Sequence, residues 1–472
     1  MPNSQFTVII VGGGIAGLTL AHCLYRANIH HIVLEKGTDL SPQVGASIGI
    51  LPNGARILDQ LSLYQHIEQH IEPLDKAHLS YPDGFCFTSL YPRILLQRFG
   101  YPIAFFDRQK LLEILHTQYP EPSNIYTNQR VSEVHRVGDR VEVVTDSGAR
   151  YTGDLVVGAD GVHSKVRSEM WRMAEELHPG LVTQSEKKSM TTEFCCVFGI
   201  SSMVPGPEVG DQVNAFQDGL SIITIIGKDG RAFWFVIKKL DRKYTYPDTV
   251  RFDDEAAARL CEEVAHVQLM DGLAFAQVWK NRLVFSMAAL EENVFPTWYC
   301  DLAVCIGDSV HKMTPNIGQG ANMAIEDAAV LANLLYEKLG NGKIQALCDA
   351  DVKTLLQEFH SIRYNRVKSI YTASRHLVRL QARAGLFNKL LGRYCIPYAP
   401  DIPAEIGSRS IGGSPSLTFV PLPDRSGPGW SKYKPREGRY IPAMLIALLL
   451  VVVSYLLHGK GVMAYYLLGT PV

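Results

Sequence analysis

The stretch that decides the fold is FTVIIVGGGIAGLTLAHCLYRANIHHIVLEK, residues 6–36. Its apolar run Thr7–Val11 predicts a buried strand, and Ile32–Leu34 predicts a second strand that ends on Glu35. Between them lies a glycine-rich turn followed by a helical pattern. The turn has G-x-G-x-x-G spacing, on Gly12, Gly14 and Gly17. A complete strand–turn–helix–strand–acid unit of this kind predicts a nucleotide-binding βαβ unit.

Each part of this unit has a physical role in holding a dinucleotide. Gly12 permits the tight turn, Gly14 lets the backbone approach a pyrophosphate, and Gly17 lets the helix and strand pack closely. The helix N-terminus offers unpaired N–H groups and about half a positive charge to phosphates. Glu35 is expected to accept hydrogen bonds from a ribose diol. The alternative is a glycine-rich turn in an ordinary βαβ unit. FAD and NAD(P) both use the unit, so these residues leave the cofactor open.

Composition and charge narrow the class of protein. The chain has 472 residues, which predicts two or more domains. Apolar residues make up 47% and charged residues 20%, as in globular proteins, and the net charge of −1 gives no sign of a nucleic-acid partner. The nine cysteines form no CxxC pair, which indicates a reducing compartment. The adjacent Cys195 and Cys196 are expected on a strand that faces two ways.

Neither a signal peptide nor a metal site is predicted. The N-terminus enters a strand at once, without a basic region or a cleavage site. The histidines at 22, 30 and 31 are interpreted as helix and strand-entry residues, because no His, Cys and acid cluster has metal-site spacing.

Two later glycine-containing turns follow predicted strands. DLVVGADGVHSKVR, residues 154–167, is an apolar strand that enters Gly-Ala-Asp-Gly and a basic helix start. By itself this pattern also fits a plain strand-to-helix turn. GDSVHKMTPNIGQGAN, residues 307–322, places Asp308 at the carboxyl end of another strand, which is the usual ligand edge of a parallel sheet. Pro315 stiffens the loop, and glycines expose N–H groups at the start of a long helix. That helix start suits the redox ring of an extended cofactor, and Asp308 would hold the ribityl chain.

Taken in order, GGGIAG, GADGVHSKVR and GDSVHKMTPNIGQGANMAIEDAAVLA resemble the FAD-dependent aromatic-hydroxylase type of flavoprotein monooxygenase. The resemblance covers roughly residues 6–380. Within that family, GASIGILPNGARILDQLSL and the C-terminal hydrophobic segment are most similar to the fungal meroterpenoid and indole-diterpene prenyl epoxidases.

The resemblance implies a set of FAD-binding residues. They are Gly12, Gly14, Gly17, Glu35, Gly49, Arg108, Asp160, Gly161, Asp308, Gly318, Gly320 and Ala321. Asp160 and Gly161 match a motif that also touches the nicotinamide cofactor, and Pro315 matches the residue packed over the ring. His311 lies near the expected reaction site, where it is either a catalytic acid or a packed or solvated loop histidine. The catalytic residue is otherwise left unknown, because the flavin carries the chemistry.

The patterns and the resemblance together imply an α/β fold. It consists of a Rossmann-like FAD-binding domain with an inserted β-sheet substrate domain, C-terminal helices and one membrane helix. The FAD-binding domain is expected over residues 1–77, 104–180 and 285–345, and the substrate domain over 78–103 and 181–284. C-terminal helices are expected over 346–396, a Pro/Gly-rich linker over 397–440 and a transmembrane helix over 441–457. Aromatic residues of the inserted sheet, Phe216, Phe233, Trp234 and Phe235, either form one wall of an apolar pocket or belong to the core.

The segment IPAMLIALLLVVVSYLL, Ile441–Leu457, carries no charge. As a helix it would span about 25 Å, near the thickness of a thin internal bilayer. A buried core helix and an amphipathic surface helix are the alternatives. Basic residues precede it at 432, 434, 436 and 439, which predicts a cytoplasmic catalytic part. We therefore expect the endoplasmic reticulum membrane as the location.

By resemblance, the expected activity is that of an NADPH- or NADH-dependent monooxygenase that acts through a flavin C4a-hydroperoxide. The expected substrate is a lipophilic prenylated molecule, whose terminal alkene is epoxidised with O2 before a separate terpene cyclase acts. Three alternatives remain open: an aromatic-ring hydroxylase of the same family, a membrane flavin reductase and a non-catalytic flavoprotein scaffold.

Overall fold

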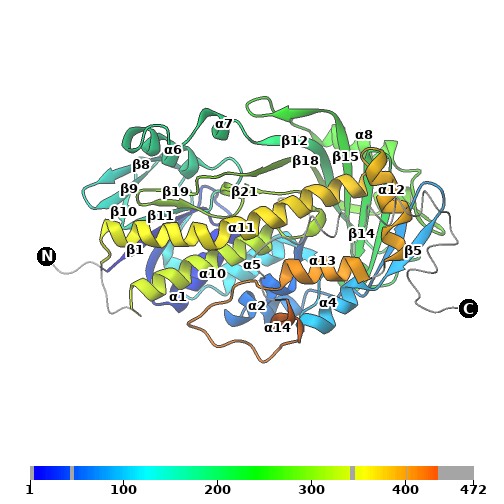
Figure 1. The fold of residues 1–472 in the computed structure, drawn as a ribbon, viewed down its shortest axis with the longest axis horizontal. Helices are drawn as coiled ribbons and strands as arrows, with labels where there is room; N and C mark the ends of the chain where they lie inside the picture. Colours follow the sequence, from blue (N-terminus) through cyan, green and yellow to red (C-terminus); the bar gives the residue numbers. More distant parts are fainter. Residues whose placement is uncertain (1–4, 43–46, 341–345, 400, 434–472) are drawn as a thin grey trace, which may run out of the picture.

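The computed structural model describes residues 5–42, 47–340, 346–399 and 401–433. Two sheets organise them, and the long helix α11 (Asp349–Gln381) runs beside both (Figure 1). The predicted α/β class with an inserted β-sheet domain is confirmed.

The first sheet contains the predicted nucleotide-binding unit. Its strand order is β19-β20-β11-β1-β2-β7, and all neighbours are parallel except β19 and β20. The strands are β1 (Thr7–Val11), β2 (His30–Leu34), β7 (Ile125–Tyr126), β11 (Leu155–Gly158), β19 (Tyr299–Cys300) and β20 (Ala303–Cys305). β1 and β11 are almost wholly buried, as expected for strands that are covered on both faces.

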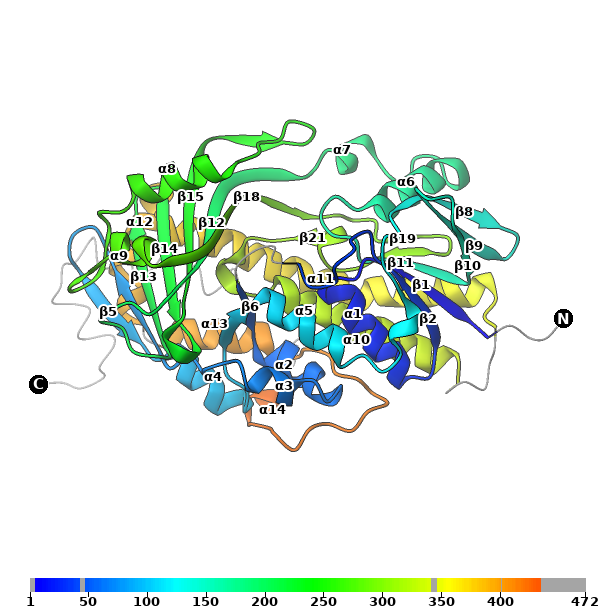
Figure 2. The same ribbon diagram turned by 180° about the vertical axis from the view of Figure 1, so that it is seen from behind.

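Helices and a small sheet cover the two faces of this parallel sheet (Figure 2). One cover contains α1 (Ile15–Arg26), α5 (Arg108–Thr117) and α10 (Gly320–Lys338). The other contains α6 (Lys165–Leu177) and the antiparallel strands β8 (Val131–Val137), β9 (Arg140–Thr145) and β10 (Arg150–Gly153). The short strand pair β3 (Ser47–Ile50) and β6 (Ala104–Asp107) joins this domain to the second sheet. Smaller elements are α2 (Pro52–Gln60), α3 (Tyr64–Glu68), η1 (Pro122–Asn124) and α7 (Gln184–Lys187).

The second sheet has eight strands in the order β21-β18-β12-β15-β14-β13-β4-β5. They are β4 (Lys76–Ser80), β5 (Cys86–Ser89), β12 (Thr191–Ser201), β13 (Asp211–Gln217), β14 (Leu220–Ile226), β15 (Ala232–Thr245), β18 (Arg282–Val294) and β21 (His311–Lys312). The short η2 (Lys228–Gly230) joins β14 to β15. Beside the sheet lie α4 (Tyr91–Phe99), α8 (Asp254–Glu263), β16 (Gln268–Met270), β17 (Leu273–Ala274) and α9 (Phe275–Lys280).

The two faces of this sheet belong to different cores, because successive side chains of a strand point to opposite faces. Cys195 packs in the core that α8 and α9 close, and Cys196 packs in the core on the opposite face. The strand that faces two ways is therefore confirmed. Trp234 likewise packs against α9, whereas Phe235 belongs to the opposite face.

Two expected segment limits are wrong. β18 pairs with β12 along nearly its whole length and with β21 at its end, so strands of the inserted sheet continue beyond 284, to Val294 and again at His311–Lys312. The described part of the expected linker, within 397–433, instead contains α13 (Asp401–Ile411) and α14 (Gly429–Lys432), and η5 (Ile396–Tyr398) lies across its start. Long-range polar contacts hold it, because Arg56 Nη2 donates to Ser414 O at 2.8 Å and Gln60 Nε2 donates to Leu417 O at 2.9 Å.

The expected C-terminal helices are present as α11 and α12 (Leu386–Tyr394). None of the helices within the described ranges is long and apolar enough to cross a membrane. The predicted transmembrane segment 441–457 lies outside the described residues.

Candidate active site

Four predicted ligand positions come together at one edge of the parallel sheet. β2, β1, β11 and β20 are successive neighbours, and their carboxyl ends lead to Glu35, Gly12, Asp160 and Asp308. Val11 pairs with Gly158, and Gly158 pairs with Cys305, so the three glycine-containing turns are aligned. Ser309 Oγ also donates to Gly158 O at 2.8 Å and ties the second turn to the third. The sheet thus brings together motifs that lie about 150 residues apart.

The first glycine turn packs closely against neighbouring backbone at Gly12 and Gly17 and faces free space at Gly14. Gly12 has a φ of +108°, and a Cβ there would lie 2.5 Å from Ala159 O. A Cβ on Gly17 would lie 1.9 Å from Gly12 O, so the helix can approach the turn only without a side chain. A Cβ on Gly14 would meet nothing within 4 Å. Gly14 is therefore the position at which the turn faces free space.

Two of the three helix starts at this edge lack a side-chain cap. α6 is capped internally, since Asp160 Oδ2 accepts from Lys165 N at 2.7 Å and Ser164 Oγ accepts from Arg167 N at 2.9 Å. Burial raises the pKa of Asp160, although hydrogen bonds from Ser164 Oγ, Val166 N and Lys165 N oppose the shift. No side chain caps α1 or α10, which begin after Gly14 and Gln319. Their first N–H groups are available to an anionic ligand, which fits a dinucleotide cofactor.

Glu35 is already held in the geometry of the first turn. Its Oε2 accepts from Gly13 N at 2.7 Å, and its Oε1 accepts from Gly37 N at 2.7 Å. These contacts fix the carboxylate at the end of β2 and beside the glycine turn. Glu35 thus lies beside the glycine turn, and its interaction with a ribose stays a prediction.

Arg108 and Asp308 come from different parts of the fold and lie near one another. Arg108 is the first residue of α5, which follows β6, and Asp308 lies in η3 (Gly307–Ser309). Burial lowers the pKa of Arg108, and the negative charge of Asp308 opposes this shift. Asp308 also forms an ion pair with Lys312. The predicted ribityl ligand and the predicted arginine thus share one region.

Asn322 joins the two segments that are predicted to lie beside the flavin ring. Its Nδ2 donates to Gly49 O at 3.0 Å and to Gly318 O at 2.7 Å, and its Oδ1 accepts from Leu51 N at 3.1 Å. Gly318 has a φ of +66°, and a Cβ on Gly320 would meet nothing within 4 Å. Asn322 is not among the predicted site residues, although it stands in the motif directly after Ala321.

A cavity of about 1300 Å³ extends from Pro315–Gly318 across the face of the second sheet. Alternate residues of three strands line it, namely Asn214 and Phe216, Ile223 and Ile225, and Phe235 and Ile237. α11, α12 and α13 close the opposite side. Phe216 and Phe235 therefore line a pocket as predicted, whereas Phe233 and Trp234 do not line it. The supposed linker supplies part of the wall.

The sheet wall of this cavity carries a row of polar side chains. Tyr91 donates its hydroxyl to Gln212 Oε1 at 2.8 Å, and Gln212 Nε2 donates to Asn214 Oδ1 at 3.0 Å. Burial raises the pKa of Tyr91 to about 12, so its hydroxyl stays neutral at physiological pH. The sheet side of the cavity is otherwise mainly apolar, whereas the helix side adds charged side chains such as Arg366, Glu405 and Arg409.

With this geometry established, comparison with known proteins identifies the family. The sequence profile of the FAD binding domain matches residues 5–356, which is most of the chain. The chain belongs to the FAD-dependent monooxygenases. It is 60% identical over 457 residues to the FAD-dependent monooxygenase atmM of Aspergillus flavus, covering 97% of this chain and 95% of that protein. It is 50% identical to paxM of Penicillium paxilli, another FAD-dependent monooxygenase, covering 99% and 100%.

Solved structures show the same fold at low sequence identity. Klebsiella pneumoniae HpxO complexed with FAD and uric acid has a TM-score of 0.66 at 19% identity, over 86% of this chain and 96% of that one. CtdE in complex with FAD and a substrate has a TM-score of 0.64 at 18% identity, over 95% and 100%. FAD is therefore the cofactor of this monooxygenase, as predicted.

His311 of the monooxygenase is a packed histidine and does not line the cavity. Its Nε2 lies 2.6 Å from Asp327 Oδ2, and both side chains are fully buried. Trp298 packs beside the imidazole ring, with 5.4 Å between the ring centroids. The structure thus agrees with the interpretation of His311 as a packed histidine.

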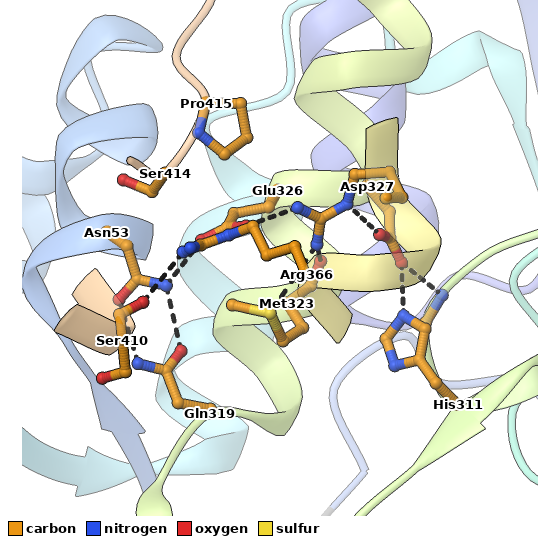
Figure 3. A network of polar contacts seen from close by, with 12 residues as sticks. Asn53, His311, Gln319, Met323, Glu326, Asp327, Arg366, Ser410, Ser414 and Pro415 are labelled. Atoms are coloured by element: carbon orange, nitrogen blue, oxygen red, sulfur yellow. Dashed lines mark hydrogen bonds and ion pairs between the residues drawn. The ribbon is translucent and has the colours of Figure 1, made fainter. Parts of the chain in front are cut away.

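A buried ionic network behind the third turn was not predicted (Figure 3). Arg363 of α11 donates to Asp327 Oδ1 at 2.7 Å and to Glu326 Oε2 at 2.5 Å. Arg366 also donates to both oxygens of Glu326, at 2.7 Å each. Burial raises the pKa of each carboxyl, but the neighbouring positive charges outweigh it and hold both pKa values below their ordinary range. The network couples α10, which begins at the predicted flavin site, to α11, which lines the cavity.

Proposed function

We propose that this monooxygenase uses NADPH or NADH and O2 to epoxidise the terminal alkene of a prenylated intermediate, of farnesyl or geranylgeranyl length. The observation that carries the proposal is the cavity of about 1300 Å³ that begins at Pro315–Gly318. It exceeds the range of about 300–1000 Å³ that is typical of sites for drug-sized ligands. Its sheet wall is mainly aliphatic and aromatic, which suits a long hydrocarbon chain.

One set of residues would bind the cofactor, and another would line the substrate site. Bound FAD would supply the redox chemistry with the nicotinamide cofactor and oxygen. The uncapped starts of α1 and α10 would hold its two ends, with Glu35 at the ribose and Asp308 and Arg108 along the ribityl chain. Phe105, Ile225 and Phe235 would exclude water from the reacting alkene.

The polar row would orient the substrate. Tyr91, Gln212 and Asn214 provide hydrogen-bonding groups in a mainly apolar wall, so they favour a molecule with one polar head and a long apolar tail. An alkene needs no side-chain nucleophile or general base at carbon for oxygen transfer. Binding of the polar head would therefore select which double bond reaches the cofactor.

The test uses purified FAD-loaded enzyme, NADPH, O2 and a farnesylated or geranylgeranylated aromatic. We expect a product with one added oxygen in the terminal isoprene unit, located by fragmentation mass spectrometry. A matched substrate with a saturated terminal bond should give no such product. Oxygen only on the ring would establish the aromatic-hydroxylase alternative. NADPH oxidation with peroxide release and no oxygenated product would point to a reductase.

The location and the next reaction belong to the same proposal. The uncharged sequence Ile441–Leu457 and the basic residues before it support attachment to the endoplasmic reticulum membrane, with the catalytic part in the cytoplasm. An epoxide at the end of a prenyl chain is a substrate for acid-initiated cyclisation, so a separate terpene cyclase would consume the product.

A further inference from the structure

Helix α12 presents apolar side chains that the protein core does not bury. At 100° per residue, Leu386, Phe387, Leu390, Leu391 and Tyr394 fall within an arc of about 140°. Leu386 is 73% exposed and Phe387 is 52% exposed, and Gly392 is the one residue of the helix that is fully buried. An amphipathic helix normally turns such an arc toward the core.

Polar contacts fix the orientation of this helix. Lys389 Nζ lies 2.6 Å from Asp218 Oδ2, and Arg393 Nε lies 2.7 Å from Asp83 Oδ2. Gly392 O accepts from the hydroxyl of Tyr81 at 2.6 Å. The charged edge of α12 is thus bound to turns of the second sheet, and Leu386, Phe387 and Tyr394 of the apolar arc stay exposed.

The exposed apolar surface continues around the cavity. Tyr398 of η5 is 59% exposed, and Ile406 of α13 is also exposed. Phe387, Leu391 and Ile406 line the cavity as well, so α12 and α13 form part of both its wall and the outer surface. We define the docking surface as Leu386, Phe387, Tyr394, Tyr398 and Ile406.

We propose that this docking surface lies on a lipid bilayer and that the apolar substrate enters the cavity from the bilayer between α12 and α13. Exposed apolar clusters of this kind mark interaction sites, and a helix with one exposed apolar arc suits a membrane interface. Bilayer contact rests on the membrane location in the proposed function, and substrate entry rests on its substrate class as well.

The path of the chain favours a bilayer over another protein as the occupant. The last described residues, Lys432 and Tyr433, also line the cavity. The sequence that follows contains the uncharged stretch Ile441–Leu457. A membrane attachment that begins next to the cavity would bring the docking surface and the bilayer together.

Bilayer contact can be measured without turnover. Leu386→Trp adds a fluorophore at the docking surface, and Leu181→Trp adds one at an exposed apolar position outside it. Full-length FAD-loaded protein is reconstituted into vesicles of phosphatidylcholine and phosphatidylserine, with or without bromine on the acyl chains. After subtraction of the native emission, brominated lipid should quench the fluorophore at 386 and not the one at 181. Equal quenching at both positions, or quenching at 386 by aqueous iodide alone, would refute the docking surface. A fluorophore at 386 that neither reagent reaches would show that other polypeptide covers it, which also refutes the proposal.

Substrate entry is tested separately with Leu386→Asp/Tyr394→Asp, since neither side chain lines the cavity. We expect kcat/KM to fall for prenylated substrate delivered in vesicles and to stay unchanged for substrate delivered in cyclodextrin. Met203→Asp/Leu283→Asp removes two exposed apolar side chains elsewhere and should change neither value. A parallel loss with both delivery routes would contradict entry from the bilayer. If no enzyme preparation oxygenates the substrate, the proposed function fails while the quenching result still stands.

Discussion

Asp327 Oδ2 lies 2.6 Å from Nε2 of His311 and also accepts a hydrogen bond from Gly307 N at 2.9 Å. One buried oxygen therefore holds both ends of the short turn that carries Asp308. Arg363 fixes the other oxygen of the same carboxylate. Asp308, the predicted ribityl ligand, is thus held in position by the buried residues Asp327 and Arg363 behind its turn.

Asp327→Asn should loosen this turn. The amide would place a donor opposite Gly307 N or His311 and would remove the charge that Arg363 requires. Loss of one partner of a buried ion pair costs about 3–5 kcal/mol. We expect a lower free energy of unfolding and weaker FAD binding, measured by denaturant titration and by flavin fluorescence.

The matched control is Asp349→Asn, which breaks an exposed ion pair with Arg136. Such pairs contribute about 0–1 kcal/mol, so stability and FAD affinity should barely change. Equal effects of the two variants would show that Asp327 has no special role in the turn.

The same network predicts how stability depends on pH. The folded-state pKa values of Glu326 and Asp327 lie below their ordinary values of 4.5 and 3.8. Their stabilising contribution is therefore fully present above pH 4.5 and is lost as the pH falls through the lower folded-state values. Glu326→Gln should give a lower free energy of unfolding at neutral pH and a shallower loss below pH 4.5. An acid slope that is unchanged in this variant would contradict the assignment.

Gly14 and Gly17 should respond differently to alanine. Gly14→Ala puts its methyl group in free space, so the melting temperature of the FAD-free protein should stay close to that of the wild type while the Kd for FAD rises. Gly17→Ala drives a methyl group to within 1.9 Å of Gly12 O and should destabilise the protein itself. Unchanged FAD affinity in Gly14→Ala would rule out cofactor approach at this turn.

The polar row of the cavity should affect substrate binding and not cofactor binding. Asn214→Leu keeps the volume roughly constant and removes the end of the row. Loss of one hydrogen bond of about 0.5–1.5 kcal/mol should raise KM for a prenylated substrate up to about tenfold, with full FAD content. Thr224→Val, whose side chain does not line the cavity, is the control and should leave KM unchanged. A loss of FAD in Asn214→Leu would place the row at the cofactor instead.

The sequence predicts those parts of the fold that depend on short-range patterns, such as glycine spacing and the alternation of side chains along a strand. The first βαβ unit, the strand endings at Asp160 and Asp308, and the two faces of the strand at Cys195 and Cys196 follow from glycine spacing and side-chain alternation. The structure adds that these strand ends are neighbours. The cofactor contacts assigned to individual residues stay predictions, and the FAD affinities proposed above test those at Gly14 and the Asp308 turn.

The sequence did not predict α13 or the buried ionic network, because both depend on contacts between segments that are distant in the sequence. α13 has the sequence DIPAEIGSRSI, whose proline, glycine and serines favour a linker interpretation. It is held as a wall by partners far away in sequence, such as Arg366, whose Nη2 donates to Ser410 O at 2.9 Å. Glu326 and Asp327 likewise resemble ordinary helix residues in the sequence. Their ion-pair partner Arg363 lies more than 30 residues further along the chain, so the local sequence does not indicate the network.

The alternation along β13, β14 and β15 has an evolutionary consequence. Side chains such as Phe216, Ile223 and Phe235 shape the cavity, while their neighbours Ala215, Ile222 and Trp234 fill a separate core beneath α8 and α9. A substitution at a cavity-facing position changes the space that is available to a ligand. The core-facing residues on the other side of the sheet are unchanged and continue to stabilise it. New substrate preferences can thus arise by drift at every second position, without a matching set of compensatory changes in the scaffold.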